Sequence, residues 1–291
     1  MFDLIKNIAV DRKNSLPIAD LHNRYRSTGT PVVFGDLTKR WPAIEEWTVD
    51  YLKAQIGHLQ VPIYSNNTKI NSAHPFKPVE NLSLKFYLDE LIHKDNDLRA
   101  SNIALSEARD LRADFSYPRL GLDFNKDRTS LYIGSENSIE PMRQSSKVVH
   151  RVHCHFGETC SVLLIPSSQS DYVYPVGRSR TALSSIDFTK PHFGKYPALE
   201  KLSGYVAELH HGDALYIPAG FWYCTAYHGF GVTLSLQADD GTVMDYVDTI
   251  TNSLLHRLAN PLPITSAKFK RLELRTHRMI NARFPDSVQL K

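Results

Sequence analysis

A run of short β-rich segments between residues 130 and 237 constrains the fold more than any other feature of the chain. Turn signals such as Gly and Pro separate these segments from one another. Short strands in this spacing are typical of a sandwich or a barrel, whereas alternating strands and helices would indicate a parallel sheet. The clearest segments are "SLYIGS", "HRVHCHF", "CSVLLIPS", "YVAELHHGDALYIPAG" and "GVTLSLQ".

Helical patterns flank this β-rich region on both sides. "SLPIADLHNRYRSTG" and "VDYLKAQIG" precede it, with short strands expected at "TPVVFGDL" and "LQVPIYS". "LSLKFYLDELIHK" has apolar residues at helical spacing and predicts a further helix. We therefore expect a β-rich domain over residues 1–240, in which an N-terminal helical and strand extension precedes a barrel core at about 130–240. Residues 241–291 are predicted to form a C-terminal helical pair.

The composition excludes several classes of protein. The chain of 291 residues carries a formal net charge of +3, which is too small to indicate nucleic-acid binding without a clustered basic patch. "MFDLIKNIAV" at the N-terminus does not have the pattern of a signal peptide, and no window approaches the roughly 18 apolar residues of a membrane helix. Three cysteines form an odd set that does not suggest a disulfide framework. We therefore expect a cytoplasmic protein.

Four segments, in order along the chain, resemble those of a known family. They are "PVVFGDLTKRWPAIEEWTVDYLKAQIG", "YIGSENSIEP", "SSIDFTKPHFGKYPALEKL" and "ELHHGDALYIPAGFWY". Together they resemble the cupin-like branch of the JmjC family of Fe(II)- and 2-oxoglutarate-dependent oxygenases, to which the asparaginyl hydroxylase that inhibits hypoxia-inducible factor belongs. The resemblance implies a double-stranded β-helix, the jelly-roll barrel of cupins, with N-terminal helices against one sheet.

The same resemblance places unsuitable residues at the family's iron ligands. The family binds iron through a His-x-Asp pair and a distal His, which leave open positions for 2-oxoglutarate and oxygen. By the resemblance these ligands fall at Arg143, Ser145 and Tyr223, the 2-oxoglutarate lysine falls at Thr159, and the Asn of the last strand falls near Ser235. An arginine stays protonated and has no lone pair for a metal. We therefore expect neither Fe(II) nor 2-oxoglutarate as a cofactor, unless the site is rebuilt.

The segment "VVHRVHCHFGETC" concentrates three histidines and two cysteines. Side chains alternate along a strand, so His153 and His155 share one face, while His150, Val152 and Cys154 share the other. The resemblance implies that the second set points into the barrel, with His150 where an active-site Asn would lie.

Two interpretations of this segment remain open. The first is a β-hairpin with solvent-facing histidines and a small buried thiol. The second is a relocated metal centre that uses His150 with Cys154. Cys154 and Cys160 do not have the spacing of a closed zinc site, so a zinc motif is not expected.

Arg143 offers a different chemistry at the position of an iron ligand. Its planar guanidinium would hold an anion such as a carboxylate in the barrel mouth, because it pairs two oxygens at once. Alternatively, Arg143 forms an ion pair with Glu140 or Glu136 and serves only the structure. Tyr223 and the two aromatic residues before it either line a pocket for an apolar ligand or pack in the core.

Three functions remain as alternatives. The first is a pseudoenzyme: a cupin-like, JmjC-related protein that has lost the iron site and binds a small molecule, amino acid, peptide or partner protein. The second is a metal-dependent hydroxylase with a rebuilt site, and the third is a protein- or nucleic-acid-interaction module that uses the basic C-terminal helices. The resemblance also implies that those helices, within residues 241–291, serve as a dimerisation element, which favours a homodimer. The pocket-lining candidates at the family's site positions are Glu140, Arg143, Ser145, His150, Val152, Cys154, Thr159, Tyr223 and Ser235.

Overall fold

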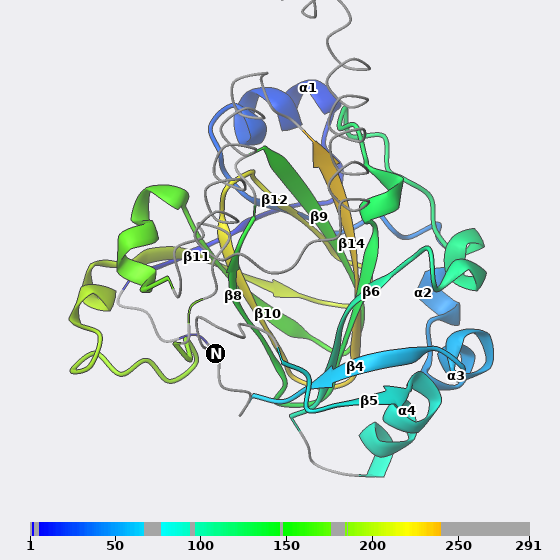
Figure 1. Cartoon of the computed structure of the whole chain (residues 1–291). Helices are drawn as coiled ribbons and strands as arrows, with labels where there is room; N and C mark the ends of the chain where they lie inside the picture. Colours follow the sequence, from blue (N-terminus) through cyan, green and yellow to red (C-terminus); the bar gives the residue numbers. More distant parts are fainter. Residues whose placement is uncertain are drawn as a thin grey trace, which may run out of the picture. The chain divides into compact units, whose positions relative to one another are not determined.

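The chain forms a mainly β structure built from two sheets (Figure 1). The computed structural model describes residues 2, 6–66, 77–93, 97–145, 148–175, 184 and 186–239. The expected C-terminal helical pair lies outside the described residues. Within them, no helix is both long and apolar enough to cross a membrane.

The larger sheet has nine strands. Its centre is the antiparallel pair β9 and β14, while β2 runs parallel to β3 at one edge. In order across the sheet the strands are β2 (Asp11–Lys13), β3 (Val32–Phe34), β12 (Ala214–Ile217), β9 (Val149–Gly157), β14 (Gly231–Asp239), β7 (Ser130–Gly134), β6 (Arg99–Ala104), β4 (Gln60–Tyr64) and β5 (Glu80–Ser83).

The smaller sheet has five strands. All its pairs are antiparallel except that of β1 with β11. In order across the sheet the strands are β1 (Lys6–Ala9), β11 (Ser203–Leu209), β10 (Cys160–Ile165), β13 (Trp222–Tyr227) and β8 (Ile139–Gln144).

The helices are short, and three of the helical segments begin at side-chain caps. At η3 (Lys126–Arg128), Asn125 Oδ1 accepts a hydrogen bond from the Asp127 N–H at 3.2 Å. The Oγ1 atom of Thr48 accepts a hydrogen bond from the Tyr51 N–H at 3.3 Å where α3 begins, and Ser83 Oγ accepts one from the Phe86 N–H at 3.3 Å where α4 begins. The helical segments are α1 (Ile18–Asp20), η1 (Leu21–Arg26), α2 (Ala43–Glu46), α3 (Val49–Ile56), α4 (Leu84–His93), η2 (Arg109–Ala113), η3 (Lys126–Arg128), η4 (Ser167–Val173) and η5 (Pro197–Lys201). The helices expected before the β-rich region are confirmed as α1 with η1, α3 and α4.

The two sheets face each other across an apolar core. Val33 and Leu215 of the larger sheet pack in one cluster with Val162 and Leu164 of the smaller sheet. A second cluster joins the outer face of the larger sheet to the N-terminal helices, and a third covers the outer face of the smaller sheet with the segment that includes Phe188. This arrangement agrees with the expected jelly-roll class and with N-terminal helices against one sheet.

A tight turn precedes β12. Gly212 has a φ of 86°, a backbone conformation that glycine adopts without steric cost. The Asp213 carboxylate accepts a hydrogen bond from the His210 N–H at 2.6 Å, and Thr38 Oγ1 donates to the Gly212 carbonyl at 2.5 Å. The turn therefore ties β11 and β12 to the N-terminal segment.

Candidate functional site

Strand β9 presents Arg151, His153 and His155 to the space between the sheets. His153 is paired with Leu215 of β12, a member of the core between the sheets. The His153 ring also lies 5.3 Å from the ring of Tyr223 on the opposite sheet, in an edge-on arrangement. This face of β9 therefore lines the interior.

The expectation that His150, Val152 and Cys154 face the interior is wrong. Val152 and Cys154 pack in the core between the larger sheet and the N-terminal helices. The Nδ1 atom of His150 lies 2.8 Å from the hydroxyl of Tyr216, which belongs to the same core, and accepts a hydrogen bond from the Ala219 N–H at 3.1 Å.

The accompanying expectation of solvent-facing histidines is wrong as well. His153 is 4% exposed and His155 is 0% exposed. The predicted alternation is present, but the two faces are exchanged. The larger apolar core lies on the helix side of the sheet, so it receives Val152 and Cys154 of β9, and Arg151, His153 and His155 turn inward.

Arg143 and Tyr223 face each other on neighbouring strands of the smaller sheet. They are direct partners in the pairing of β8 with β13, and the guanidinium carbon lies 6.0 Å from the centre of the Tyr223 ring. The same carbon lies 5.3 Å from the ring of Tyr132 on the larger sheet. A guanidinium over aromatic faces is a favourable arrangement. Arg143 therefore occupies the space between the two sheets.

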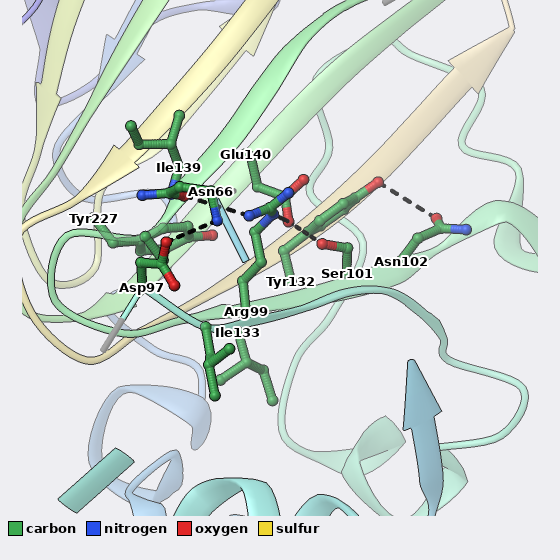
Figure 2. Close-up of polar contacts among 12 residues, drawn as sticks. Asn66, Asp97, Arg99, Ser101, Asn102, Tyr132, Ile133, Ile139, Glu140 and Tyr227 are labelled. Atoms are coloured by element: carbon green, nitrogen blue, oxygen red, sulfur yellow. Dashed lines mark hydrogen bonds and ion pairs between the residues drawn. The ribbon is translucent and has the colours of Figure 1, made fainter. Parts of the chain in front are cut away.

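Glu140 places a buried carboxylate beside Arg143. It is 5% exposed and accepts short hydrogen bonds from Ser101 Oγ and from an N–H of Arg143. Arg99 Nε lies 3.6 Å from the same carboxylate, and Figure 2 shows Arg99 and Ser101 beside it. The ion pair of Arg143 with Glu140, which the sequence left open, is thus present.

The residues at the three expected iron-ligand positions do not fit Fe(II). Burial disfavours the charge of Arg143, but the attraction of Glu140, and then of Tyr132 and Tyr223, outweighs it and raises the pKa of Arg143. A protonated guanidinium offers no lone pair to a metal. The Ser145 hydroxyl donates to a backbone carbonyl at 2.8 Å, and neutral hydroxyls such as those of serine and tyrosine are poor ligands for Fe(II).

The structure describes no alternative metal centre. Within the described ranges, no three His, Cys, Asp or Glu side chains lie close enough together to hold a metal ion. Cys154, Cys160 and Cys224 are free and buried, and burial raises the pKa of each thiol. Metals bind the thiolate rather than the thiol. The pair of His150 and Cys154 therefore finds no third donor in this part of the chain.

Arg151 is held by neutral side chains. Its Nε donates to Ser145 Oγ at 3.3 Å, and one terminal nitrogen donates to Ser235 Oγ at 3.4 Å. Its guanidinium carbon lies 5.6 Å from the Tyr223 ring. Among the described residues, no carboxylate forms an ion pair with it. A half-buried cation thus faces the interior without a counter-charge from this part of the chain.

His153 is buried without hydrogen bonds. Neither ring nitrogen has a partner within the residues that the structure describes. Burial, and then the charges of Arg151 and Arg143, lower the pKa of His153 to about 3. The ring is therefore neutral, with one donor and one acceptor nitrogen, and leaving both unmet in a buried place is costly.

A groove of about 330 Å³ is lined by residues of β6, β7, β14 and η3. Asn102 of β6, Ser130 of β7, Gln237 of β14 and Asp127 of η3 contribute to its lining. Ser130 Oγ is buried and, in the described part of the chain, has no partner. The Tyr132 hydroxyl donates to Asn102 Oδ1 at 3.4 Å, as Figure 2 shows. The groove therefore borders the polar interior.

Five of the residues expected at the site lie around this interior. They are Glu140, Arg143, Ser145, Tyr223 and Ser235. Thr159 lies instead in the turn between β9 and β10, where its carbonyl accepts from the His228 N–H at 3.0 Å. Sequence reasoning missed Arg151, His153 and Tyr132. The alternation of β9 placed the first two on one face, but that face was expected to point outward. That the five residues line a binding pocket stays a prediction.

Comparison with known proteins identifies the family. A family model described as a cupin-like domain matches residues 18–236. JmjC domain-containing protein D of Dictyostelium discoideum is 25% identical over 230 residues, which cover 70% of this chain and 50% of that protein. Lysine-specific demethylase JMJ30 of Arabidopsis thaliana is 23% identical over 223 residues, which cover 74% of this chain and 51% of that protein.

A third relative is Jumonji C domain-containing protein 5 of Drosophila melanogaster. It is 21% identical over 231 residues, which cover 75% of this chain and 56% of that protein. The chain thus spans about half the length of the curated relatives it matches. On the family match and the two-sheet fold, the chain belongs to the cupin-like domain family and is related to the JmjC-domain proteins.

Proposed function

We propose that this protein binds a small anionic molecule between its two sheets and does so without iron. The observation that carries the proposal is the pair Arg143 and Tyr223, which stands where the family resemblance places two iron-binding histidines. A permanent cation at a ligand position repels a metal dication and attracts an anion.

The charges around the interior support an anion as the ligand. Glu140 already interacts with two guanidinium groups, those of Arg99 and Arg143. Arg151 adds a further positive charge that meets no carboxylate in the described chain. A charge that leaves water is stable only when an opposite charge or strong hydrogen bonds accompany it. A carboxylate or another oxyanion would supply both.

A protein that binds an anion without iron would differ in chemistry from relatives named as demethylases. Two relatives carry the printed name of lysine-specific demethylase. A protein in which Arg143 replaces an iron ligand would keep the fold and the position of the site, but bind rather than oxidise. A hydroxylase with a rebuilt metal site is the alternative, and the described residues provide no set of three donors for it.

Metal retention tests the first half of the proposal. The full chain is incubated anaerobically with Fe(II), Mn(II) and Zn(II) in turn, desalted, and analysed for bound metal. We expect far less than one metal ion per chain. Near-stoichiometric iron that survives desalting, together with oxygen uptake, would contradict the proposal and favour the rebuilt oxygenase.

Ligand-induced stabilisation tests the second half. Thermal unfolding of the full chain is followed with acetate, succinate, phosphate and sulfate, because a ligand that binds only the folded state raises its stability. We expect at least one of these anions to raise the Tm of the wild type, and to raise that of Arg143→Gln less. Arg40→Gln removes an exposed arginine and is the matched control. Anions that leave the wild type unaffected would contradict the proposal.

A further inference from the structure

The hydrogen-bonding capacity of His153 points to a missing partner. The side chain is 4% exposed, both ring nitrogens lack a partner among the described residues, and the ring lies against Tyr223 and, at 6.4 Å, Tyr132. His155, two residues along the same face, is different. Its Nδ1 lies 3.3 Å from Thr233 Oγ1, and its Nε2 makes a short contact with the Glu158 carbonyl. Of these two histidines, only His153 therefore has ring nitrogens that remain available to a ligand.

Arg151 lies next to His153 on this face of β9. Side chains two residues apart on a strand project from the same face. The hydroxyl groups of Ser145 and Ser235 hold the Arg151 guanidinium in place, and the Tyr223 ring lies against it. A guanidinium anchored by neutral groups is ready to take a carboxylate, because its planar fork can pair both oxygens.

Strand register connects this pair to the groove. Gln237 of β14, which lines the groove, is the cross-strand partner of Arg151. Ser130 of β7 also lines it and is the partner of Ser235, which is in turn the partner of His153. Directly opposed residues lie about 5 Å apart on one face of a sheet. The groove therefore offers an approach to Arg151 and His153.

We propose that Arg151 and His153 form a subsite for a short hydroxycarboxylate, which approaches along the groove at Ser130 and Gln237. The carboxylate pairs with the Arg151 guanidinium, and the hydroxyl forms a hydrogen bond with one of the two ring nitrogens of His153. This inference rests on the proposed function in that it takes an anion to be the ligand of the interior.

The neutral state of His153 favours a hydroxyl over a second anionic group. A neutral imidazole presents one donor and one acceptor, and a hydroxyl can engage either of them. Carboxylate oxygens only accept, so an anion such as acetate would leave the acceptor nitrogen unmet. Sulfate likewise offers acceptors alone. A hydroxyl beside a carboxylate therefore suits the pair better than a simple anion.

Calorimetric titration of the full, dialysed chain tests this subsite. The ligands are L-lactate and L-malate, with propionate and succinate as matched acids without the hydroxyl. We expect each hydroxy acid to bind about tenfold more tightly than its matched acid, the effect of one hydrogen bond. Arg151→Gln should weaken hydroxy-acid binding about a hundredfold, and His153→Leu should remove the tenfold preference for the hydroxyl.

Controls separate binding from folding. Arg40→Gln changes charge by the same amount at an exposed position and should leave affinity unchanged. His150→Gln alters a histidine on the opposite face of the same strand and should also leave affinity unchanged. Should His153→Leu fail to fold, His153→Phe offers a second apolar ring of similar shape, and circular dichroism verifies folding of every variant.

The outcomes distinguish this inference from the proposed function. Carboxylates that bind equally with and without the hydroxyl, or whose affinity is unchanged in Arg151→Gln, would overturn the hydroxycarboxylate subsite and leave anion binding in place. Phosphate or sulfate as the only ligand would do the same. Retained iron, or the absence of any anion binding, would overturn the proposed function itself and this inference with it.

Discussion

The Arg143 guanidinium lies 6.0 Å from the ring of Tyr223, its direct partner across strands β8 and β13. Both side chains point between the sheets, where the family resemblance places two metal-binding histidines. The ion pair of Arg143 with Glu140 makes the position structural, but it does not exhaust the positive charge of the interior, because Arg151 adds another guanidinium.

Removing the Glu140 carboxylate should destabilise the fold. Glu140→Gln would leave Arg99 and Arg143 without their shared counter-charge in the described interior. Breaking one side of a buried ion pair typically costs about 3–5 kcal/mol. Urea unfolding measures the change. Glu136→Gln, at an exposed position, is the control and should change the free energy of unfolding by less than about 0.5 kcal/mol.

His153 and His155, the buried histidines of β9 that point between the sheets, should respond oppositely to the same substitution. His155→Leu loses hydrogen bonds to Thr233 and the Glu158 carbonyl and should lower the free energy of unfolding by about 1–3 kcal/mol. His153→Leu removes two unmet polar atoms and should raise it by about 1 kcal/mol in dialysed protein. Chemical denaturation measures both variants. A clear loss of stability in His153→Leu would mean that its ring nitrogens already have partners.

Stability should fall as the pH drops below about 6.5. Burial lowers the pKa of His153 to about 3 and that of His155 to about 4, from an ordinary value of 6.5. Between pH 6.5 and 4 the unfolded chain therefore binds more protons than the folded chain. Each histidine should reduce the free energy of unfolding by about 1.4 kcal/mol per pH unit in this window.

Comparison of variants isolates the part of this pH dependence that comes from His153. Unfolding of His153→Leu at pH 7.5, 6.0 and 5.0 should show a slope smaller than that of the wild type by about 1.4 kcal/mol per unit below pH 6. His22→Gln replaces an exposed histidine and should keep the wild-type slope. Equal slopes in all three proteins would show that His153 is protonated as easily in the folded chain as in the unfolded one.

All three cysteines should resist modification in the native protein. Cys154, Cys160 and Cys224 are buried, and burial raises the pKa of each thiol, so little reactive thiolate is exposed. We expect that an aromatic disulfide reagent, which releases a coloured thiolate when it reacts, will detect no thiol within minutes at pH 7.5. In denaturant the same reagent should detect all three thiols. A native chain that reacts quickly at one thiol would indicate local opening of the strand that carries it.

Much of the fold was predictable from local patterns. The β-rich texture of residues 130–237 predicted a sandwich or a barrel, and the apolar spacing around Leu84 and Leu88 predicted the helix now seen as α4. These elements depend on interactions between residues close in sequence, so the sequence carries their signal. The polar network of Arg99, Ser101 and Glu140 joins β6 to β8 across a sequence gap of about forty residues, and no local pattern predicted it.

The candidate site was likewise predictable from the sequence only in part. The resemblance carried by its order of motifs predicted that Arg143 and Tyr223 stand at the family's ligand positions, and this assignment stays a prediction. From alternation the sequence determined that His153 shares a face with His155, and Val152 with Cys154. Only the tertiary structure decided which face points between the sheets. Alternation with a period of two is identical for both orientations of a strand, and the choice depends on which side offers the larger apolar core. For β9 that side is the core shared with the N-terminal helices, so His153 and His155 lie between the sheets.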